Sequence, residues 1–252
     1  MREDKIKMYK SIFLSDIHLG TRGCKIDLLL DFLRHHETEQ LVLVGDIIDL
    51  WKLRSSWFWP NKHNDFIRKL IKISKIGTKI IFVPGNHDEF FRQFIPISFG
   101  DIDIVRTLEY DAVNGKKYII MHGDEFDFVI RRYKWLAIIG SHCYDWLIRL
   151  NTINAWIRDK LKLRYWSLSK SIKYSVKDAI KTMDNYEVAM AEYAKKRNFD
   201  GVICGHIHNA QIKNIQGIEY LNCGDWVESC TAITEDKKGN FKLIEWLQKK
   251  DA

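Results

Sequence analysis

The chain has 252 residues, of which 46% are hydrophobic and 29% are charged, and it carries a formal net charge of +7. These values are typical of a folded globular protein and exclude a fibrous or fully disordered chain. No apolar run approaches the roughly 20 residues of a membrane span, and the charged first residues lack the apolar segment of a signal peptide. Five cysteines without C-x-x-C spacing indicate free thiols, so we expect a cytoplasmic protein.

Short apolar runs rich in Val, Ile and Leu recur along the chain, and each ends directly in polar residues. These predicted strands lie at 12–14, 41–44, 80–83, 118–121 and 202–204. Apolar residues at helical spacing predict helices at 26–36 and 64–76 between the early strands. This alternation predicts parallel pairing with right-handed crossovers, and it places functional residues at the carboxyl ends of the strands.

The later part of the chain has a different pattern. Turn signals at Asn114-Gly115, Gln216-Gly217 and Lys238-Gly239-Asn240 separate further short strands. They predict a second, largely antiparallel sheet. We therefore expect an α/β fold in which two sheets pack face to face with helices outside.

Residues 126–200 interrupt this plan, and we expect them to form a helical insertion, or lid, within one domain that spans residues 1–252. The segment contains 15 Lys or Arg and 8 Asp or Glu, a difference of +7 that equals the net charge of the whole chain. It also holds four tryptophans, and apolar residues at 178–197 follow helical spacing. Such a segment favours binding to phosphates, nucleic acid or an anionic membrane face. The alternative is that the segment forms ordinary helices, with the aromatic residues in a core and the charged residues on a solvated face.

Polar motifs that can bind metals follow the five predicted strands. They are Asp16-Ile17-His18, Gly45-Asp46-Ile47-Ile48-Asp49, Gly85-Asn86-His87-Asp88, His122-Gly123-Asp124 and Gly205-His206-Ile207-His208. Each motif alone is weak, because an Asp after a strand is often a helix N-cap and a His-x-His pair can be an exposed turn. Together they supply carboxylate, amide and imidazole ligands for two divalent metals about 3.5–4 Å apart. The set predicts a hydrolase.

This set of motifs resembles the calcineurin-like metallophosphoesterases over essentially the whole chain. The resemblance implies a four-layer αββα sandwich and two metal ions that share the bridging ligand Asp46. It assigns one ion to Asp16, His18, Asp46 and His208, and the other to Asp46, Asn86, His122 and His206. Mn²⁺ is the expected metal, and an N/O ligand set also accepts Fe, Zn or Co.

The same resemblance gives roles to the remaining polar residues of the motifs. His87 matches the acid histidine of the family, which stabilises the transition state or protonates the leaving oxygen. Asp88 would orient His87, and the two would form the catalytic pair. We expect Asp49 and Asp124 to support the ligand loops rather than to bind metal, although both can equally be ordinary loop carboxylates.

Longer strings are similar to the UDP-2,3-diacylglucosamine pyrophosphohydrolase branch of that family. They are Ser15–Gly20, Gly45–Trp51, His122–Asp127 and Gly224–Trp226. The resemblance implies cleavage of UDP-2,3-diacylglucosamine, a nucleotide-linked glycolipid, into UMP and 2,3-diacylglucosamine 1-phosphate during lipid A biosynthesis. It implies that the insertion holds acyl chains, with peripheral contact at the cytoplasmic face of the inner membrane. The candidate substrate contacts are Arg131, Arg132, Lys173 and Lys177.

One position departs from that branch, and two other functions stay open. Enzymes of the branch carry Arg in a G-N-R-D motif where this chain has His87, which indicates a sister group. A phosphodiesterase or nuclease of the same superfamily would use the basic insertion to bind another nucleotide or nucleic acid. A scaffold without catalysis would have kept the fold alone, but the complete ligand set favours an enzyme. The oligomeric state is open.

Overall fold

A computed structural model describes residues 6–127 and 185–247. The chain divides into two compact units, Met1–Asp124 with Met190–Ala252, and Glu125–Ala189. Most of the predicted insertion at 126–200 lies outside the described residues, and so do four predicted substrate contacts, Arg131, Arg132, Lys173 and Lys177. Residues 185–196 are helical, as expected for that part of the range. Among the helices that the structure describes, none has the length and apolar character needed to cross a bilayer.

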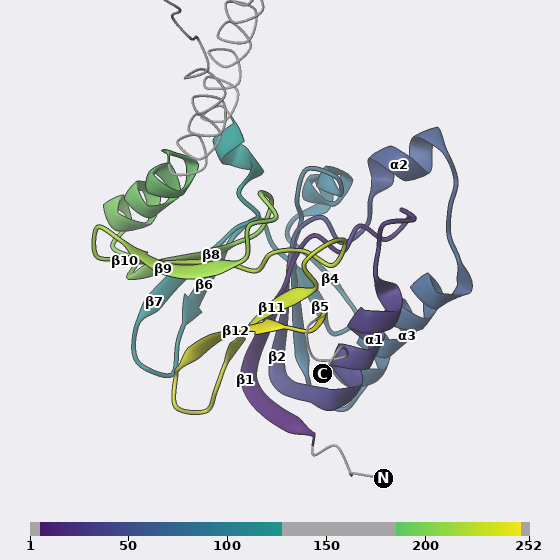
Figure 1. Ribbon diagram of the computed structural model, residues 1–252, viewed down its shortest axis with the longest axis horizontal. Coiled ribbons are helices and arrows are strands. Elements are labelled where there is room, and N and C mark those ends of the chain that lie inside the picture. The colour runs from purple at the N-terminus through teal and green to yellow at the C-terminus, as the bar shows by residue number, and fades with distance from the viewer. Residues whose placement is uncertain (1–5, 128–184, 248–252) are drawn as a thin grey trace, which may run out of the picture. The chain divides into compact units, whose positions relative to one another are not determined.

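The first unit contains a seven-stranded sheet in the order β12-β11-β1-β2-β3-β5-β4 (Figure 1). Its strands are β1 (Lys7–Leu14), β2 (His36–Val44), β3 (Lys79–Val83), β4 (Ile97–Phe99), β5 (Ile102–Ile104), β11 (Thr231–Glu235) and β12 (Phe241–Glu245). The strands β1, β2 and β3 pair in parallel, which confirms the predicted parallel pairing. The connections contain α1 (Ile26–His35), α2 (Leu50–Ser55) and α3 (Asn61–Lys75). Sequence periodicity did not predict the short helix α2.

A second sheet has five strands in the order β6-β7-β8-β10-β9. They are β6 (Leu108–Asp111), β7 (Lys117–Ile120), β8 (Gly201–Cys204), β9 (Gln211–Ile215) and β10 (Ile218–Asn222). The expectation of a largely antiparallel sheet was wrong, because β7 pairs with β8 and β8 pairs with β10 in parallel. A parallel pair needs a long connection, and the segment between β7 and β8 supplies one.

The C-terminal hairpin also differs from expectation. The turn at 238–240 joins β11 to β12, and both strands belong to the seven-stranded sheet. β11 pairs antiparallel with β1 and is buried along its whole length. This placement covers an edge of β1 that would otherwise leave backbone groups unpaired.

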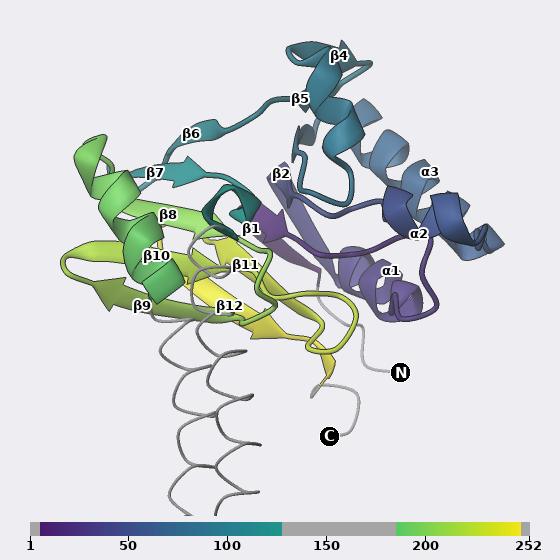
Figure 2. The same ribbon diagram turned by 90° about the horizontal axis from the view of Figure 1, so that it is seen from above.

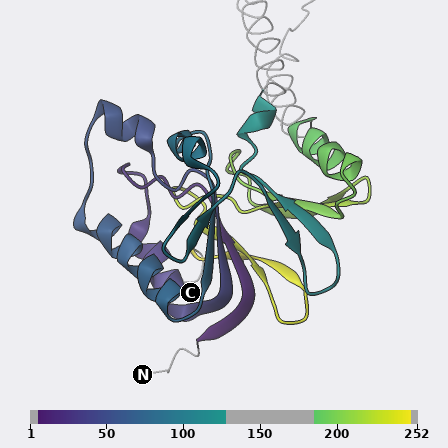
Figure 3. The same ribbon diagram turned by 180° about the vertical axis from the view of Figure 1, so that it is seen from behind.

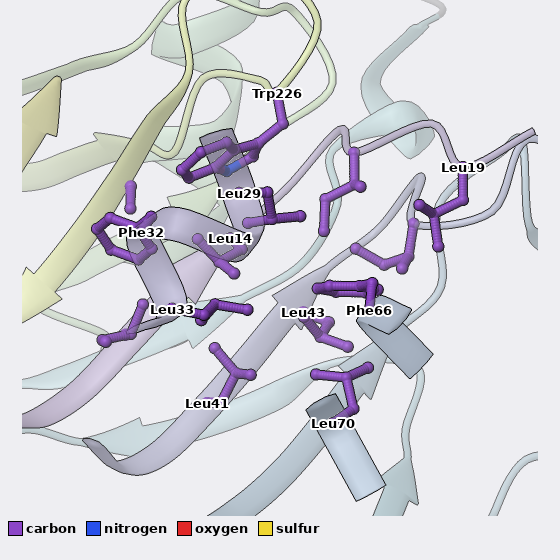
Figure 4. Packing of buried hydrophobic residues seen from close by; sticks show 14 of the residues in the cluster. Leu14, Leu19, Leu29, Phe32, Leu33, Leu41, Leu43, Phe66, Leu70 and Trp226 are labelled. Carbon is purple, nitrogen blue, oxygen red and sulfur yellow. The ribbon is translucent and has the colours of Figure 1, made fainter. Parts of the chain in front are cut away.

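Strand alternation divides the core into two layers. In β1, Ile12 and Leu14 face the helices, whereas Phe13 faces the second sheet. Figure 4 shows the helix-side layer, in which Phe32 of α1 and Phe66 of α3 pack with leucines of the strands. Full burial of each such side chain stabilises the fold by about 1.5–3 kcal/mol.

The layers of the first unit stack as helices, sheet, sheet and helix. Helices α1 and α3 cover one face of the seven-stranded sheet, and the second sheet lies on its other face (Figures 1 and 2). The helical residues from Met190 onward cover the outer face of the second sheet (Figure 3), where Met190, Ala191 and Ala194 are buried. The fold is therefore the expected αββα sandwich.

Candidate metal centre

Loops at the carboxyl ends of strands from both sheets bring the predicted ligands together. Asp16 and His18 follow β1, Asp46 follows β2, Asn86 follows β3, His122 follows β7, and His206 and His208 follow β8. The ligand atoms of Asp16, His18 and His208 all lie within 4.8 Å of one another, and those of Asp46, His122 and His206 form a second such group. Each group contains residues that the resemblance assigns to one of the two ions, without Asp46 in the first group and without Asn86 in the second. A third group of the same kind consists of His18, Asp49 and His87.

The backbone is strained at five of these ligands. Asp16, His18, Asp46, His206 and His208 have φ angles of 52°, 52°, 55°, 71° and 51°. Side chains other than glycine rarely adopt this left-handed region, and such residues concentrate at functional sites. The loops are therefore bent so that their side chains point into one common space.

Asp46 lies at the centre of the cluster. Its Oδ2 atom is 3.3 Å from Nε2 of His122 and 3.9 Å from Nε2 of His18. It is also 3.9 Å from Nε2 of His87. One carboxylate oxygen thus lies between imidazoles of both ligand groups, which is the position a bridging ligand requires.

The buried polar atoms of this cluster fit divalent metal ions. Nε2 of His18, Nε2 of His122 and Oδ1 of Asn86 are buried and have no hydrogen-bond partner within the described part of the chain. Buried polar atoms are normally hydrogen-bonded, so three such atoms in one cluster require an explanation. Nδ1 of His122 donates to the carbonyl of Val44 at 2.9 Å, which leaves Nε2 as the ligand atom. Imidazole, carboxylate and amide donors together suit Mn, Fe, Zn or Co.

Gly85 permits the close approach of the ligand loops. A Cβ atom at Gly85 would overlap the carboxylate of Asp46 and the ring of His122. The glycine is therefore required by packing against two predicted ligands, a reason that the motif itself does not reveal.

The carboxylates of the cluster favour the protonated form of the His18 and His122 imidazoles when no metal is bound. Burial acts to lower the pKa of His122, but the carboxylates of Asp46 and Asp16 outweigh it and raise that pKa to about 10. Burial likewise opposes the rise at His18, where Asp16 and Asp49 raise the pKa to about 10. Despite its burial, the pKa of Asp16 lies well below its usual range because His18 and His208 are adjacent.

These pKa shifts predict the direction of pH dependence for metal binding. A raised imidazole pKa means that a proton occupies the ring below about pH 10, and a metal must displace that proton. We expect the apparent affinity for Mn²⁺ to increase from about pH 6.5 to about pH 8.5, with net proton release. Calorimetry in buffers of different ionisation enthalpy measures both quantities. A pH-independent affinity would contradict ligation by these rings.

Asp49, and not Asp88, has its carboxylate beside the ring of His87. Oδ1 of Asp49 is 3.0 Å from Nδ1 of His87, and its Oδ2 is 3.2 Å from Nδ1 of His18. Asp88, to which the resemblance gives this role, accepts instead from the backbone N–H groups of Gly85 at 2.6 Å and Ile47 at 2.7 Å. The side chain of Asp88 therefore clamps the loops that carry Asp46 and Asn86. Asp49 supports His18 as expected and also orients His87.

Arg92 joins the ligand loops of the two sheets. It lies in the 3₁₀ helix η1 (Glu89–Phe94) and donates to both carboxylate oxygens of Asp124, at 2.9 and 2.7 Å. It also donates to the carbonyl of Pro84, at 2.8 and 3.2 Å. Pro84 precedes Asn86, and Asp124 follows His122. Sequence analysis missed Arg92, because its partners are 8 and 32 residues away and no local pattern marks it.

We expect Arg92→Met to lower metal affinity and activity about 10–100-fold, the usual cost of losing a partner that supports metal ligands. Asp124→Asn should have a similar effect, and the double variant should be little worse, because the two side chains act as one unit. Arg68→Met is the matched control, since Arg68 pairs with Asp65 on an exposed helix face. Metal titration and steady-state kinetics measure the effects. Unchanged metal affinity in Arg92→Met would contradict this positioning role.

Comparison with known proteins assigns the chain to a family. The model of the calcineurin-like phosphoesterase family matches residues 9–210. This protein therefore belongs to the calcineurin-like phosphoesterases and is a phosphoester hydrolase. Membership implies divalent metal ions, and the ligand groups described above are the candidates to hold them.

The individual relatives described next share at most 28% sequence identity with this chain. The chain is 28% identical to the UDP-2,3-diacylglucosamine hydrolase of Neisseria meningitidis serogroup A and 27% identical to that of Neisseria gonorrhoeae. Each match spans 233 residues, which is 90% of this chain and 93% of the relative. The E. coli phosphoesterase Yfce aligns with a TM-score of 0.46 at 14% identity, over 93% of this chain and 98% of Yfce.

Proposed function

We propose that this protein is a dinuclear metal hydrolase that cleaves the pyrophosphate of UDP-2,3-diacylglucosamine into UMP and 2,3-diacylglucosamine 1-phosphate. The observation that carries the reaction class is the position of the Asp46 carboxylate between two groups of ligands. Relatives with the name UDP-2,3-diacylglucosamine hydrolase, similar over nine-tenths of the chain, support the substrate. Such a reaction belongs to lipid A biosynthesis.

The ligand atoms described above would hold two ions. Asp16, His18, Asp46 and His208 hold one, and Asp46, Asn86, His122 and His206 hold the other, with Mn²⁺ as the expected metal. Bound ions supply Lewis acidity, which activates water near neutral pH and offsets the charge on phosphoryl oxygens. The strained loops keep the ligands in place before substrate arrives, so that little reorganisation is needed in the transition state.

His87 would assist the leaving group. Its Nε2 lies at the rim of the cluster, 3.9 Å from Asp46 Oδ2, while Asp49 holds its Nδ1 at 3.0 Å. In hydrolysis of the pyrophosphate, one bond from phosphorus to the bridging oxygen breaks and a phosphate monoester leaves. His87 can donate a proton to that oxygen or stabilise its charge.

The test of this function is a comparison of substrates. With Mn²⁺, the purified protein should release UMP from UDP-2,3-diacylglucosamine faster than it cleaves a generic phosphodiester, and a chelator should remove both activities. Chromatographic detection of UMP gives the rate. An equal or lower rate on the lipid would place the enzyme outside the lipid A reaction.

His87 itself favours a second candidate, a phosphodiesterase that acts on another nucleotide or on nucleic acid. Including a single-stranded oligonucleotide among the substrates tests this alternative, whose binding should weaken steeply as salt concentration rises. Peripheral contact with the inner membrane stays a prediction, because its expected carriers lie outside the described residues.

A further inference from the structure

A pocket of about 450 Å³ lies directly beside the metal centre, within the compact unit that holds the ligands. Helix α2 contributes Trp51 and Arg54 to its wall, and η1 contributes Phe90. Arg106, between β5 and β6, completes the wall together with His87. His87 therefore lies between Asp46 and the pocket. A substituent on a phosphorus atom bound at the metal centre could extend past His87 into the pocket.

Two aromatic side chains line the pocket and are partly exposed. The ring of Trp51 lies 4.2 Å from the ring of His87, at an interplanar angle of 35°. Trp51 is nevertheless 47% exposed, and Phe90 is 42% exposed. Flat aromatic surface at this position suits a planar ligand ring, and stacking of one base on such a side chain contributes about 1–3 kcal/mol.

The charge of the pocket is positive. Its described lining includes three arginines, Arg54, Arg92 and Arg106, and one carboxylate, Glu89; the guanidinium of Arg92 is engaged by Asp124. Guanidinium groups recognise phosphate through paired hydrogen bonds. Acyl chains would gain little here, because covering charged groups without new partners is unfavourable. Aromatic surface combined with cations matches a nucleotide and opposes a lipid tail.

We infer that this pocket binds the nucleoside half of the substrate, with the pyrimidine base against Trp51 and the ribose phosphate toward the arginines. The inference rests on the proposed function, because a nucleotide-linked pyrophosphate carries its nucleoside either on the reacting phosphorus itself or one phosphate away from it. It makes Trp51 the residue that distinguishes nucleotides from other phosphoesters. The acyl chains then extend away from this pocket.

Calorimetry of the full chain supplied with Mn²⁺ tests the pocket with two probes, UMP and ribose 5-phosphate, which differ only by the base. UMP should bind at least about tenfold more tightly, a factor at the low end of base stacking. Trp51→Ala should remove most of this difference and change ribose 5-phosphate affinity less than about twofold, while Trp51→Phe should keep part of it. Trp57→Ala is the matched control, because Trp57 is 77% exposed and lies outside the pocket.

The outcomes separate this inference from the proposed function. Equal affinity for UMP and ribose 5-phosphate in the unmodified protein would overturn the inference, even if UDP-2,3-diacylglucosamine is hydrolysed. An equal loss for both probes in Trp51→Ala would also overturn it, because the effect would then arise at the phosphate. A base preference that depends on Trp51 supports the pocket, even if the lipid is not hydrolysed and the proposed function fails.

Discussion

Asp46→Asn is expected to lower kcat/KM by a factor on the order of 10³ or more, because the variant removes the one carboxylate placed between both ligand groups. Partners that only support a metal ligand change affinity or activity about 10–100-fold, and a ligand shared by two ions should exceed that range. Metal content should fall in parallel, since Oδ2 of Asp46 lies 3.3 Å from His122 and 3.9 Å from His18. Kinetics and elemental analysis measure the two losses.

The fold should survive this substitution. The hydrophobic layers do not include Asp46, and the backbone of its loop is held by the Asp88 carboxylate through Ile47. A near-ultraviolet circular dichroism spectrum like that of the unmodified protein checks this point. Asp65→Asn on the exposed face of α3 is the control and should retain full activity. Full activity in Asp46→Asn would exclude the proposed mechanism.

The second large effect is expected at His87. His87→Ala should lower kcat about 10²–10⁴-fold, the usual contribution of a positioned general acid. Metal content distinguishes this role from ligation, because His18, Asp49 and His87 also form a group that could hold an ion. A general acid at this position predicts that the metal content changes little. His35→Ala removes an imidazole at the end of α1, at the opposite end of β2 from Asp46, and serves as the control.

Substrates with different leaving groups test whether His87 acts as a general acid. A general acid matters most for a strongly basic leaving oxygen, so His87→Ala should slow cleavage of an alkyl phosphodiester, which releases an alkoxide, more than cleavage of a p-nitrophenyl ester. Stopped assays with both substrates give the two ratios. An equal loss with both substrates would argue for a role in positioning or charge stabilisation instead of proton transfer.

Local patterns in the sequence predicted the strands and the early helices, and they marked the candidate metal ligands at the strand ends. Buried parallel strands are short and almost wholly apolar, so β1, β2 and β3 stand out, and the first polar residue after each marks a loop at the site. Asp16, Asp46 and Asn86 could be predicted in this way because their roles depend on a neighbouring strand. The same local signals could not assign the C-terminal hairpin to a sheet. The apolar pattern of β11 and β12 would be the same in either of the two sheets.

Contacts between distant segments were decided only by the tertiary structure. Asp88 follows His87 directly in the sequence, whereas Asp49 belongs to a different motif. Only the tertiary structure shows that Asp49 lies beside the ring of His87 while Asp88 turns to the backbone. Arg92 joins Pro84 to Asp124 across 8 and 32 residues. The pocket that contains Trp51 and Arg106 likewise gathers separate segments. The sequence by itself thus determined which chemical groups are available at the strand ends, whereas packing of the two sheets decided which of them touch.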